Sequence, residues 1–255
     1  MASAHSIRLT AALLLLAAAV AVLASLGRWQ LHRADERRAI LAAIEAGRAQ
    51  PPLALAAGTP AAELAAWRPA RAQGAWLGEL SVLLENRNQN GRPGYWLATP
   101  LLLDAAHRQA VLVLRGWLPR QPDGAAPRPP AAAAGPQSVA GELAPRVPRL
   151  FELWSLGAPR ASLPPALPAG AEPPMVQNLD LSDYARATGL ALLPAVLMQT
   201  EGDDGLVRDW PQPSVDYNQN LGYALQWFSF AAIAAIAWLA VAARAWRGAR
   251  RGGGR

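Results

Sequence analysis

Residues 221–243 read LGYALQWFSFAAIAAIAWLAVAA and contain no charged side chain. A second uncharged stretch, residues 9–27, lies near the other end of the chain. A helix needs about 20 residues to cross a hydrocarbon core about 30 Å thick. Both stretches are long enough, so the sequence predicts two transmembrane helices that flank a central segment, residues 28–220.

Each stretch also has an alternative interpretation. Residues 9–27 follow Arg8 and contain small residues such as Ala19 and Ala21, a pattern compatible with a cleaved signal peptide. Their length exceeds the roughly 7–15 residues of a usual signal-peptide core, which favours a membrane span. Residues 221–243 are compatible with a buried core helix. Their all-round hydrophobicity and the arginine-rich end that follows favour a second span.

Arginine residues predict the orientation of the two spans. The tail, residues 244–255, carries five arginines and no acid, and cationic flanks are retained in the cytoplasm. Two spans place both ends on one side, so residues 1–8 are predicted to be cytoplasmic too. The segment 28–220 then lies on the outer side, and the expected location is a bacterial inner membrane with this domain in the periplasm. An opposing signal is a group of arginines just beyond the first span, at positions 28, 33, 37 and 38.

The formal net charge of +6 does not indicate nucleic-acid binding. Arg8 and the five tail arginines account for six of the 24 basic residues, and the segment between the spans holds 18 basic and 18 acidic residues. The surplus is therefore an orientation signal at the lipid bilayer and not a polyanion-binding face. The chain has no cysteine, which excludes disulfides, thiolate metal sites and a cysteine nucleophile.

The segment between the spans predicts a mostly antiparallel β domain, barrel-like or sandwich-like, so the fold class is that of an α+β membrane protein. A helix is expected to continue from residue 28 to about residue 49, because Pro51 and Pro52 follow. A short helical piece is expected at residues 61–67. Six or so short strands follow, with candidates at residues 81–85, 95–103, 110–117, 138–143, 150–153, 175–179 and 195–200.

Turn and cap residues divide these strands. Asn90 and Gly91 suit a hairpin turn that needs positive φ. Asp180 or Ser182 is expected to cap a brief helix that runs through Thr188 and stops at Gly189. Two proline-rich stretches, residues 121–137 and 158–174, are predicted to be loops, the first of them exposed.

Catalytic motifs are missing from the sequence, so we do not predict an enzyme. Its three histidines stand at positions 5, 32 and 107, and it contains no G-x-S-x-G, H-E-x-x-H, P-loop or dinucleotide motif. His107, in LLLDAAHRQAVLV, is interpreted as a hairpin-turn residue in preference to a base.

Polar side chains at the predicted outer ends of the spans indicate a different kind of site. Gln226 lies inside the second span, where an amide needs a partner. Gln30 supplies a matching amide, so we expect either an interhelical hydrogen bond between the two or contact with a ligand. Trp29, Tyr223 and Trp227 lie nearby; they suit an aromatic belt at the membrane interface or a surface for a flat, amphipathic molecule.

Five segments, in this order, resemble the signatures of the SURF1 family of cytochrome c oxidase assembly proteins. They are LGRWQLHR (residues 26–33), LLENRNQNGRPGYWLATPL (83–101), VLVLRGWLP (111–119), VQNLD (176–180) and LGYALQWF (221–228). The resemblance implies a non-enzymatic role in maturing oxidase subunit I, two spans and a large domain outside them. It further implies that haem a is received from haem A synthase and presented for insertion.

Haem a binding implied by the resemblance gives the candidate site residues Trp29, Gln30, His32, Arg115, Asn220, Tyr223, Gln226 and Trp227. Arg28 and Arg115 are candidate partners of the haem propionates, although a salt-paired surface arginine is the alternative for each. Many family members have a histidine, proposed as iron ligand, where this chain has Asn220. An asparagine amide is a poor axial ligand, so His32 and, less favourably, Tyr223 are the substitutes. The opposing hypothesis is a scaffold that steadies nascent subunit I without binding haem.

Overall fold

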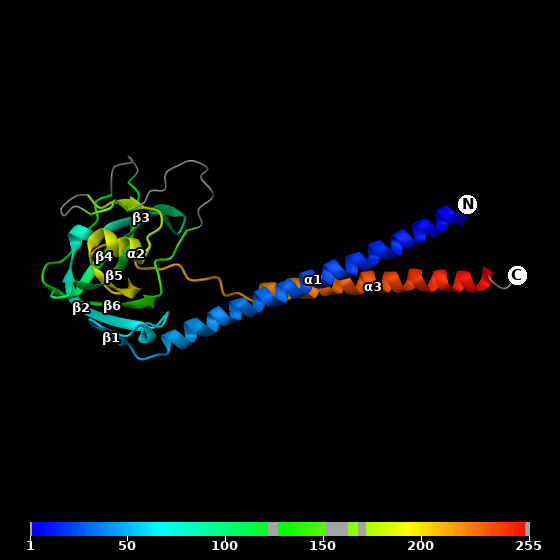
Figure 1. Ribbon diagram of the computed structural model, residues 1–255, viewed down its shortest axis with the longest axis horizontal. Coiled ribbons are helices and arrows are strands. Elements are labelled where there is room, and N and C mark those ends of the chain that lie inside the picture. Colours follow the sequence, from blue (N-terminus) through cyan, green and yellow to red (C-terminus); the bar gives the residue numbers. More distant parts are fainter. Residues whose placement is uncertain (1, 122–126, 151–162, 168–171, 253–255) are drawn as a thin grey trace. The chain divides into compact units, whose positions relative to one another are not determined.

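The computed structural model describes residues 2–121, 127–150, 163–167 and 172–252. Its chain divides into two compact units, one formed by Met1–Ala42 with Gln212–Arg255 and the other by Ala43–Pro211 (Figure 1). The elements in chain order are α1 (Ala2–Arg48), β1 (Leu53–Leu55), η1 (Ala61–Glu63), β2 (Pro69–Trp76), η2 (Gly78–Leu80), β3 (Val82–Gln89), β4 (Arg92–Asp104), β5 (Gln109–Pro119), β6 (Pro136–Ala144), β7 (Met175–Val176), α2 (Leu181–Thr188), β8 (Ala191–Gln199) and α3 (Asn218–Gly252).

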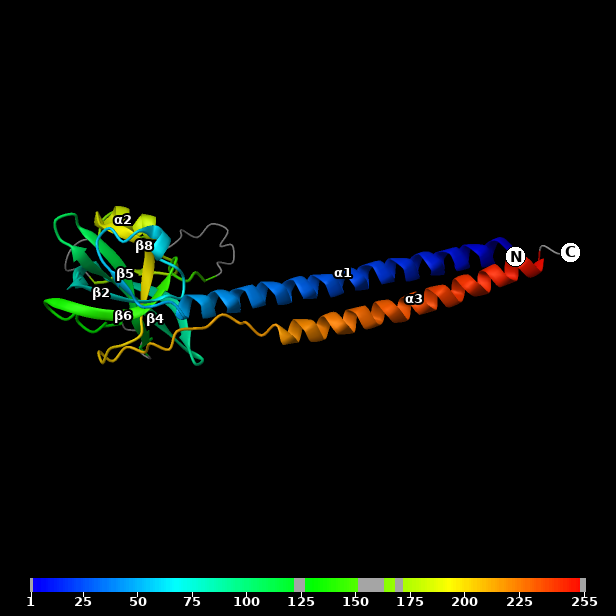
Figure 2. The same cartoon turned by 90° about the horizontal axis from the view of Figure 1, so that it is seen from below.

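The first unit is an antiparallel pair of helices, α1 and α3, although the barrel residues separate them in the sequence (Figure 2). We call this helix pair the hairpin. Their buried and partly buried positions recur at alternating intervals of three and four residues, the 3.5-residue period of a coiled-coil seam. On α1 the seam includes Leu13, Val20, Leu23, Gly27, Gln30 and Ala34, and on α3 it includes Asn220, Ala224, Trp227, Ala231 and Trp238.

A glycine permits the close approach of the two helices. A Cβ at Gly27 would lie 2.8 Å from ring carbons of Phe228. Small residues at helix contacts allow such packing in membranes, where hydrophobic driving force between helices is weak. Both helices are long and apolar enough to span a bilayer, over Ser6–Arg48 and Asn218–Gly248. The two apolar helices predicted from the sequence are therefore present.

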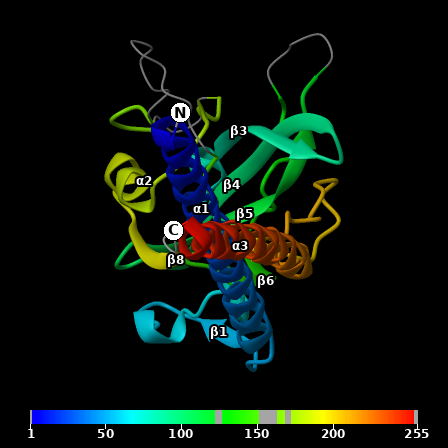
Figure 3. The same ribbon diagram turned by 90° about the vertical axis from the view of Figure 1, so that its right-hand side faces the viewer.

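The second unit contains a closed barrel of five strands in the order β2, β6, β8, β5 and β4. β2 closes it by pairing with β4 at Ala75↔Leu102 and Trp76↔Leu101. β3 and β7 extend the sheet beyond β4, and β1 adds to the edge of β2. α2 contacts β8 on the outside of the barrel (Figure 3). Every strand of the barrel sends alternate side chains inward, among them Ala72, Leu101, Val113, Val139 and Leu197.

β5 is buried on both of its faces. Val111 and Val113 point into the barrel, whereas Leu112 and Leu114 join a second core with Trp96, Trp117 and Tyr184 of the outer layer. A strand buried on both sides reads as a continuous apolar run, which is why AVLVLRGW stands out in the sequence. The two cores thus share β5 as their common wall.

The turn and helix caps agree with the sequence predictions. Asn90 and Gly91 have φ of 51° and 81°, as a type I′ hairpin turn requires. α2 begins after Asp180, whose carboxylate accepts the backbone N–H of Ser182, and ends at Gly189 with φ of 66°. α1 continues as one helix to Arg48, before Pro51, as predicted.

The predicted mostly antiparallel β domain is confirmed: the described residues form an eight-stranded sheet in which β1–β2, β3–β7 and β5–β8 are the parallel pairs. Other predictions need correction. The expected helix at residues 61–67 is only the 3₁₀ turn η1, and β7 is shorter than the predicted strand 175–179. Within the loop predicted to be exposed, Pro127 is buried and β6 already begins at Pro136. The candidate strand 150–153 lies mostly outside the described residues.

A substitution where β2 pairs with β4 tests whether the barrel is closed. A Cβ at Gly74 would lie 2.2 Å from the backbone oxygen of Leu102, so Gly74→Ala has to push β2 away from β4. We expect a loss of about 1–3 kcal/mol in the free energy of unfolding, measured by thermal and chemical denaturation of the full chain. The matched control is Gln73→Ala, an exposed change on the same strand. Equal stability of the two variants would contradict the closure.

Candidate functional site

An amide pair joins the two helices at the end of the hairpin remote from the chain termini. Asn220 Nδ2 donates to Gln30 Oε1 at 2.6 Å. Asn220 is only 9% exposed, and its Oδ1 is buried without a hydrogen-bond partner among the described residues. Just beyond the pair, Arg37 Nη1 donates to the backbone oxygen of Asp216, and the Arg38 guanidinium lies 4.6 Å from the ring centre of Tyr217.

The expected hydrogen bond between Gln30 and Gln226 is not formed. Gln226 is exposed and makes no hydrogen bond within the part of the chain that the structure describes. Its position on α3 is one residue away from Trp227, which belongs to the seam, and successive residues of a helix lie about 100° apart. Gln226 therefore faces away from α1, and Asn220 takes the place predicted for it.

His32 and Trp29 form an open face of α1. The His32 side chain is 73% exposed, and its Nε2 lies 3.3 Å from a carboxylate oxygen of Glu36 one turn later. Trp29 is 55% exposed and precedes His32 by three residues, so both side chains emerge on neighbouring parts of the helix surface. Arg28 is also exposed here. This face offers a flat indole, an accessible imidazole and a cation.

The aromatic residues predicted on α3 differ in exposure. Tyr223 is exposed, whereas Trp227 is partly buried in the seam and makes an edge-to-face contact with Phe230 at 6.2 Å between ring centres. Of the predicted site residues in the hairpin, only Gln30 and Asn220 are therefore joined by a hydrogen bond across α1 and α3. The others present their side chains outward or pack in the seam.

Arg115 belongs to the barrel unit. Its side chain is 4% exposed; Nη2 lies 2.9 Å from Asp204 Oδ2, and its guanidinium carbon is 5.2 Å from the ring centre of Trp76. Asp204 Oδ1 accepts a hydrogen bond from Arg208 Nη2, so one carboxylate forms ion pairs with two buried arginines. Burial raises the pKa of Asp204, but the hydrogen bonds from Arg208 and Arg115 outweigh it, and the pKa lies below its ordinary value. The interpretation of Arg115 as a salt-paired surface residue is thus half right, because it is paired but buried.

A further buried cation, Arg87, was not singled out as a site residue. It is 3% exposed, stacks 4.5 Å from the ring centre of Trp96 and donates to the backbone oxygen of Gln177 at 2.9 Å. It has no acidic partner among the described residues, and burial lowers its pKa to about 10. The nitrogens Arg87 Nε and Trp96 Nε1 are both buried without a partner there. One local signal marks this position, an arginine inside the motif NRNQNG.

The histidine nearest to a carboxylate in the barrel unit lies in a turn. His107 lies in the turn between β4 and β5, exposed, with Nδ1 2.5 Å from the Asp104 carboxylate, as its interpretation as a turn residue predicts. Among the residues that the structure describes, no group of three or more His, Asp or Glu side chains is placed to hold a metal ion. The polar hairpin end and the buried arginines of the barrel are the features that call for a function.

The surroundings of Asn220 and His32 differ in how well they would suit a haem iron. Asn220 directs its amide nitrogen into the helix seam, and its oxygen is enclosed, so this side chain does not suit an axial ligand. His32 presents an imidazole to the outside beside Trp29, which is compatible with iron ligation and stacking on a flat ring.

Comparison with known proteins identifies a family. A family model described as the SURF1 family matches residues 17–232, which include most of α1, the whole barrel and the first part of α3. No curated protein matches the chain.

The Gln30–Asn220 pair can be measured with a double-mutant cycle. We expect Gln30→Leu and Asn220→Leu to show a coupling free energy of about 0.6–1.7 kcal/mol, the range of such bonds between membrane helices. The measurement is unfolding of the full chain in mixed micelles. Gln226→Leu is the control, and we expect no loss of stability from it because the amide is exposed and unpaired in the described structure. Zero coupling, or a cost at Gln226, would contradict the assignment.

The lowered pKa of Asp204 predicts that the stability of the folded chain decreases in acid. Because its pKa is lowered in the folded chain, its contribution to stability is complete above the ordinary value of 3.8 and is lost as the pH falls through the folded value. Asp204→Asn should therefore be less stable than the natural chain near about pH 6, and the difference should shrink below about pH 3. Urea unfolding followed by tryptophan fluorescence measures it. A difference that is constant over this range would exclude the ion pair.

Proposed function

Because the chain belongs to the SURF1 family, which is associated with cytochrome c oxidase assembly, we propose that it helps subunit I of that oxidase to mature at a membrane. Two candidate membrane-spanning helices flank a β domain, which fits an anchored assembly factor. We place it in a bacterial inner membrane, with both termini in the cytoplasm and the barrel in the periplasm. The arginine-rich tail supports this orientation, since cationic flanks stay in the cytoplasm.

Haem a is the proposed cargo, received from haem A synthase and passed toward subunit I. The observation that carries this proposal is the open face of α1, where His32 and Trp29 are both accessible. His32 would hold the iron and Trp29 would cover part of the flat ring, while Arg28 would attract a propionate. The haem itself supplies the redox centre of the mature oxidase.

Asn220 and Gln30 have a supporting role in this scheme. Their hydrogen bond fixes the register of α1 against α3 at the same end of the hairpin, because a one-residue slip would separate the amides. The face that carries His32 is thereby held on a rigid pair of helices. Tyr223 is exposed on α3 and is the weaker candidate ligand.

A second candidate function is a scaffold that stabilises nascent subunit I without binding haem. The enclosed amide of Asn220 favours it, since the position where relatives are thought to carry a histidine is here part of the helix seam. In this case the barrel would contact subunit I directly, and oxidase assembly would not depend on His32.

Haem analysis of the purified protein separates the two candidates. The full chain is co-expressed with a haem A synthase, purified in detergent, and examined by absorption spectroscopy and haem extraction. We expect about one haem a per chain, lost in His32→Ala and retained in Asn220→Ala and in the control Arg33→Ala, a neighbouring exposed residue. Oxidase activity of cells carrying each variant is measured in parallel.

Other results distinguish the alternatives. Absence of haem a from the natural chain, with His32→Ala supporting normal oxidase activity, would contradict the carrier and favour the scaffold. Normal oxidase activity in cells that lack the protein altogether would contradict both candidates.

A further inference from the structure

The motif Arg115-Gly116-Trp117 forms a β-bulge in the barrel. Leu114 pairs with Ala98 and Gly116 with Leu97, so Arg115 is the extra residue between two adjacent partners on β4. Gly116 has φ of 154°, and a Cβ there would lie 2.7 Å from Leu206 Cβ. A bulge turns a side chain out of the regular ladder and is frequent beside functional sites. Here the bulge directs the Arg115 side chain toward Asp204 and Trp76.

The segment that follows β8 is attached to this bulge. Trp117 and Val207 exchange backbone hydrogen bonds of 2.7 and 2.9 Å, which brings Asp204 to Arg115 and Arg208. The three side chains carry two positive charges and one negative charge. Nε of both arginines is buried without a partner among the described residues, so the single carboxylate does not satisfy the two guanidinium groups. A buried cation that is not fully paired favours an additional anion.

Arg115 also lines a cavity of about 440 Å³, within the range of small-molecule sites. Its lining is largely polar, and the apolar side chains in it come from Trp76, Pro130, Pro173 and the alanines at positions 131–134, so they can cover one side of a bound molecule. The other hydrogen bond of the Arg115 guanidinium, from Nη1 to the backbone oxygen of Pro130, is long at 3.4 Å. Glu79 lines the cavity too, but it is exposed, and water screens its charge more than that of a buried arginine.

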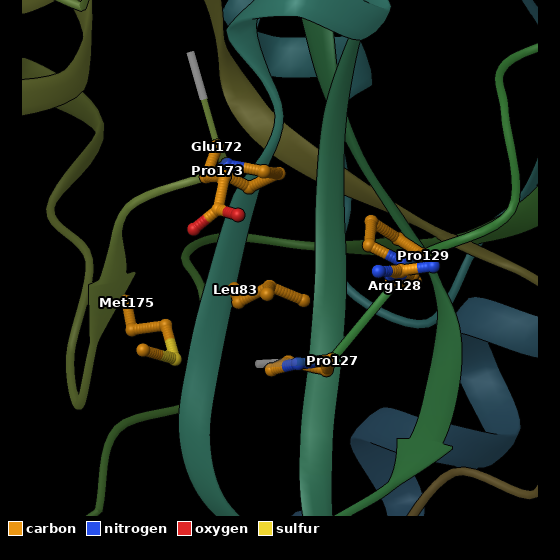
Figure 4. A pocket seen from close by; sticks show the side chains of 7 residues that line it. All are labelled: Leu83, Pro127, Arg128, Pro129, Glu172, Pro173 and Met175. Carbon is orange, nitrogen blue, oxygen red and sulfur yellow. The ribbon is translucent and has the colours of Figure 1, made fainter. Parts of the chain in front are cut away.

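A neighbouring cavity of about 370 Å³ shares Pro129 and Pro173 with the first (Figure 4). Leu83 lies at its centre, with Arg128 and Glu172 on opposite sides. Both charged residues are exposed and opposite in sign, so the lining of this cavity has no net charge. It extends the apolar surface available next to Arg115.

We propose that the cavity beside Trp76 binds a small molecule that has a carboxylate group and an apolar body, with Arg115 as the carboxylate partner. The carboxylate takes the N–H groups of Arg115 that the Pro130 oxygen holds only loosely, and the apolar body lies against Trp76 and the alanines. This site is in the barrel and is independent of the proposed haem face on α1. Its existence does not depend on the proposed function.

Two probes of equal shape test the proposal on the full chain in detergent. The first is 1-naphthoate, and the second is its uncharged analogue 1-naphthamide. We expect the carboxylate to bind about tenfold more tightly or better, after subtraction of binding to empty micelles, because charge-assisted hydrogen bonds to arginine are stronger than neutral ones. Equal binding of the two probes, or no binding of either, would overturn the proposal without any variant.

Variants locate the binding. Arg115→Gln should lose the preference for the carboxylate, whereas Arg208→Gln should retain it, because Arg208 shares Asp204 but does not line the cavity. Ala132→Trp fills the cavity and should abolish binding of both probes while Arg115 is unchanged. If Arg115→Gln does not fold, the result for Ala132→Trp decides. Undiminished naphthoate binding in the folded Ala132→Trp variant would exclude this cavity as the site.

Discussion

β5 is hydrogen-bonded along both edges and buried on both faces, and the barrel unit depends on it. It pairs with β4 on one side and β8 on the other, and its side chains divide between the barrel interior and the outer core. A residue placed on such a strand has very little freedom to move. The bulge at Arg115 takes this side chain out of the β4–β5 ladder in mid-strand, so the rigid strand around it sets the geometry of the arginine cluster.

Buried polar side chains have different kinds of partner in the two units. In the hairpin, Asn220 and Gln30 meet directly, and the remaining acceptor of Asn220 stays enclosed. In the barrel, Arg115 and Arg208 share Asp204, whereas Arg87 relies on the Trp96 ring and a backbone oxygen. Burying a cation without an acid is costly, and replacing it with an apolar residue of similar volume is often neutral or stabilising. Burial of Arg87 without an acid is therefore a cost that the Trp96 ring and the Gln177 oxygen offset.

Much of the fold was predictable because its signals are local. Apolar runs indicated α1 and α3, Asn90-Gly91 the hairpin turn, and Asp180 with Gly189 the limits of α2. β2 was missed because its inward residues are alanines, small enough for the barrel interior but without a strand-like pattern. Matching amides at similar depth predict a Gln30–Gln226 pair, whereas the 3.5-residue spacing of the helix contact places Asn220 opposite Gln30. Asp204 stands 89 positions from Arg115, and no local pattern links them.

The order of strands in the barrel also limits how the chain can fold. β8 pairs with β5 on one edge and with β6 on the other. It therefore fills the gap between two strands that are synthesised much earlier. Closure has to wait until residues 191–199 have been synthesised, just before α3. Contacts between distant parts of a chain form slowly, because the loop entropy is lost before the contacts are gained. A chain truncated before β8 would present the open edges of β5 and β6 and would be a natural substrate for quality-control proteases.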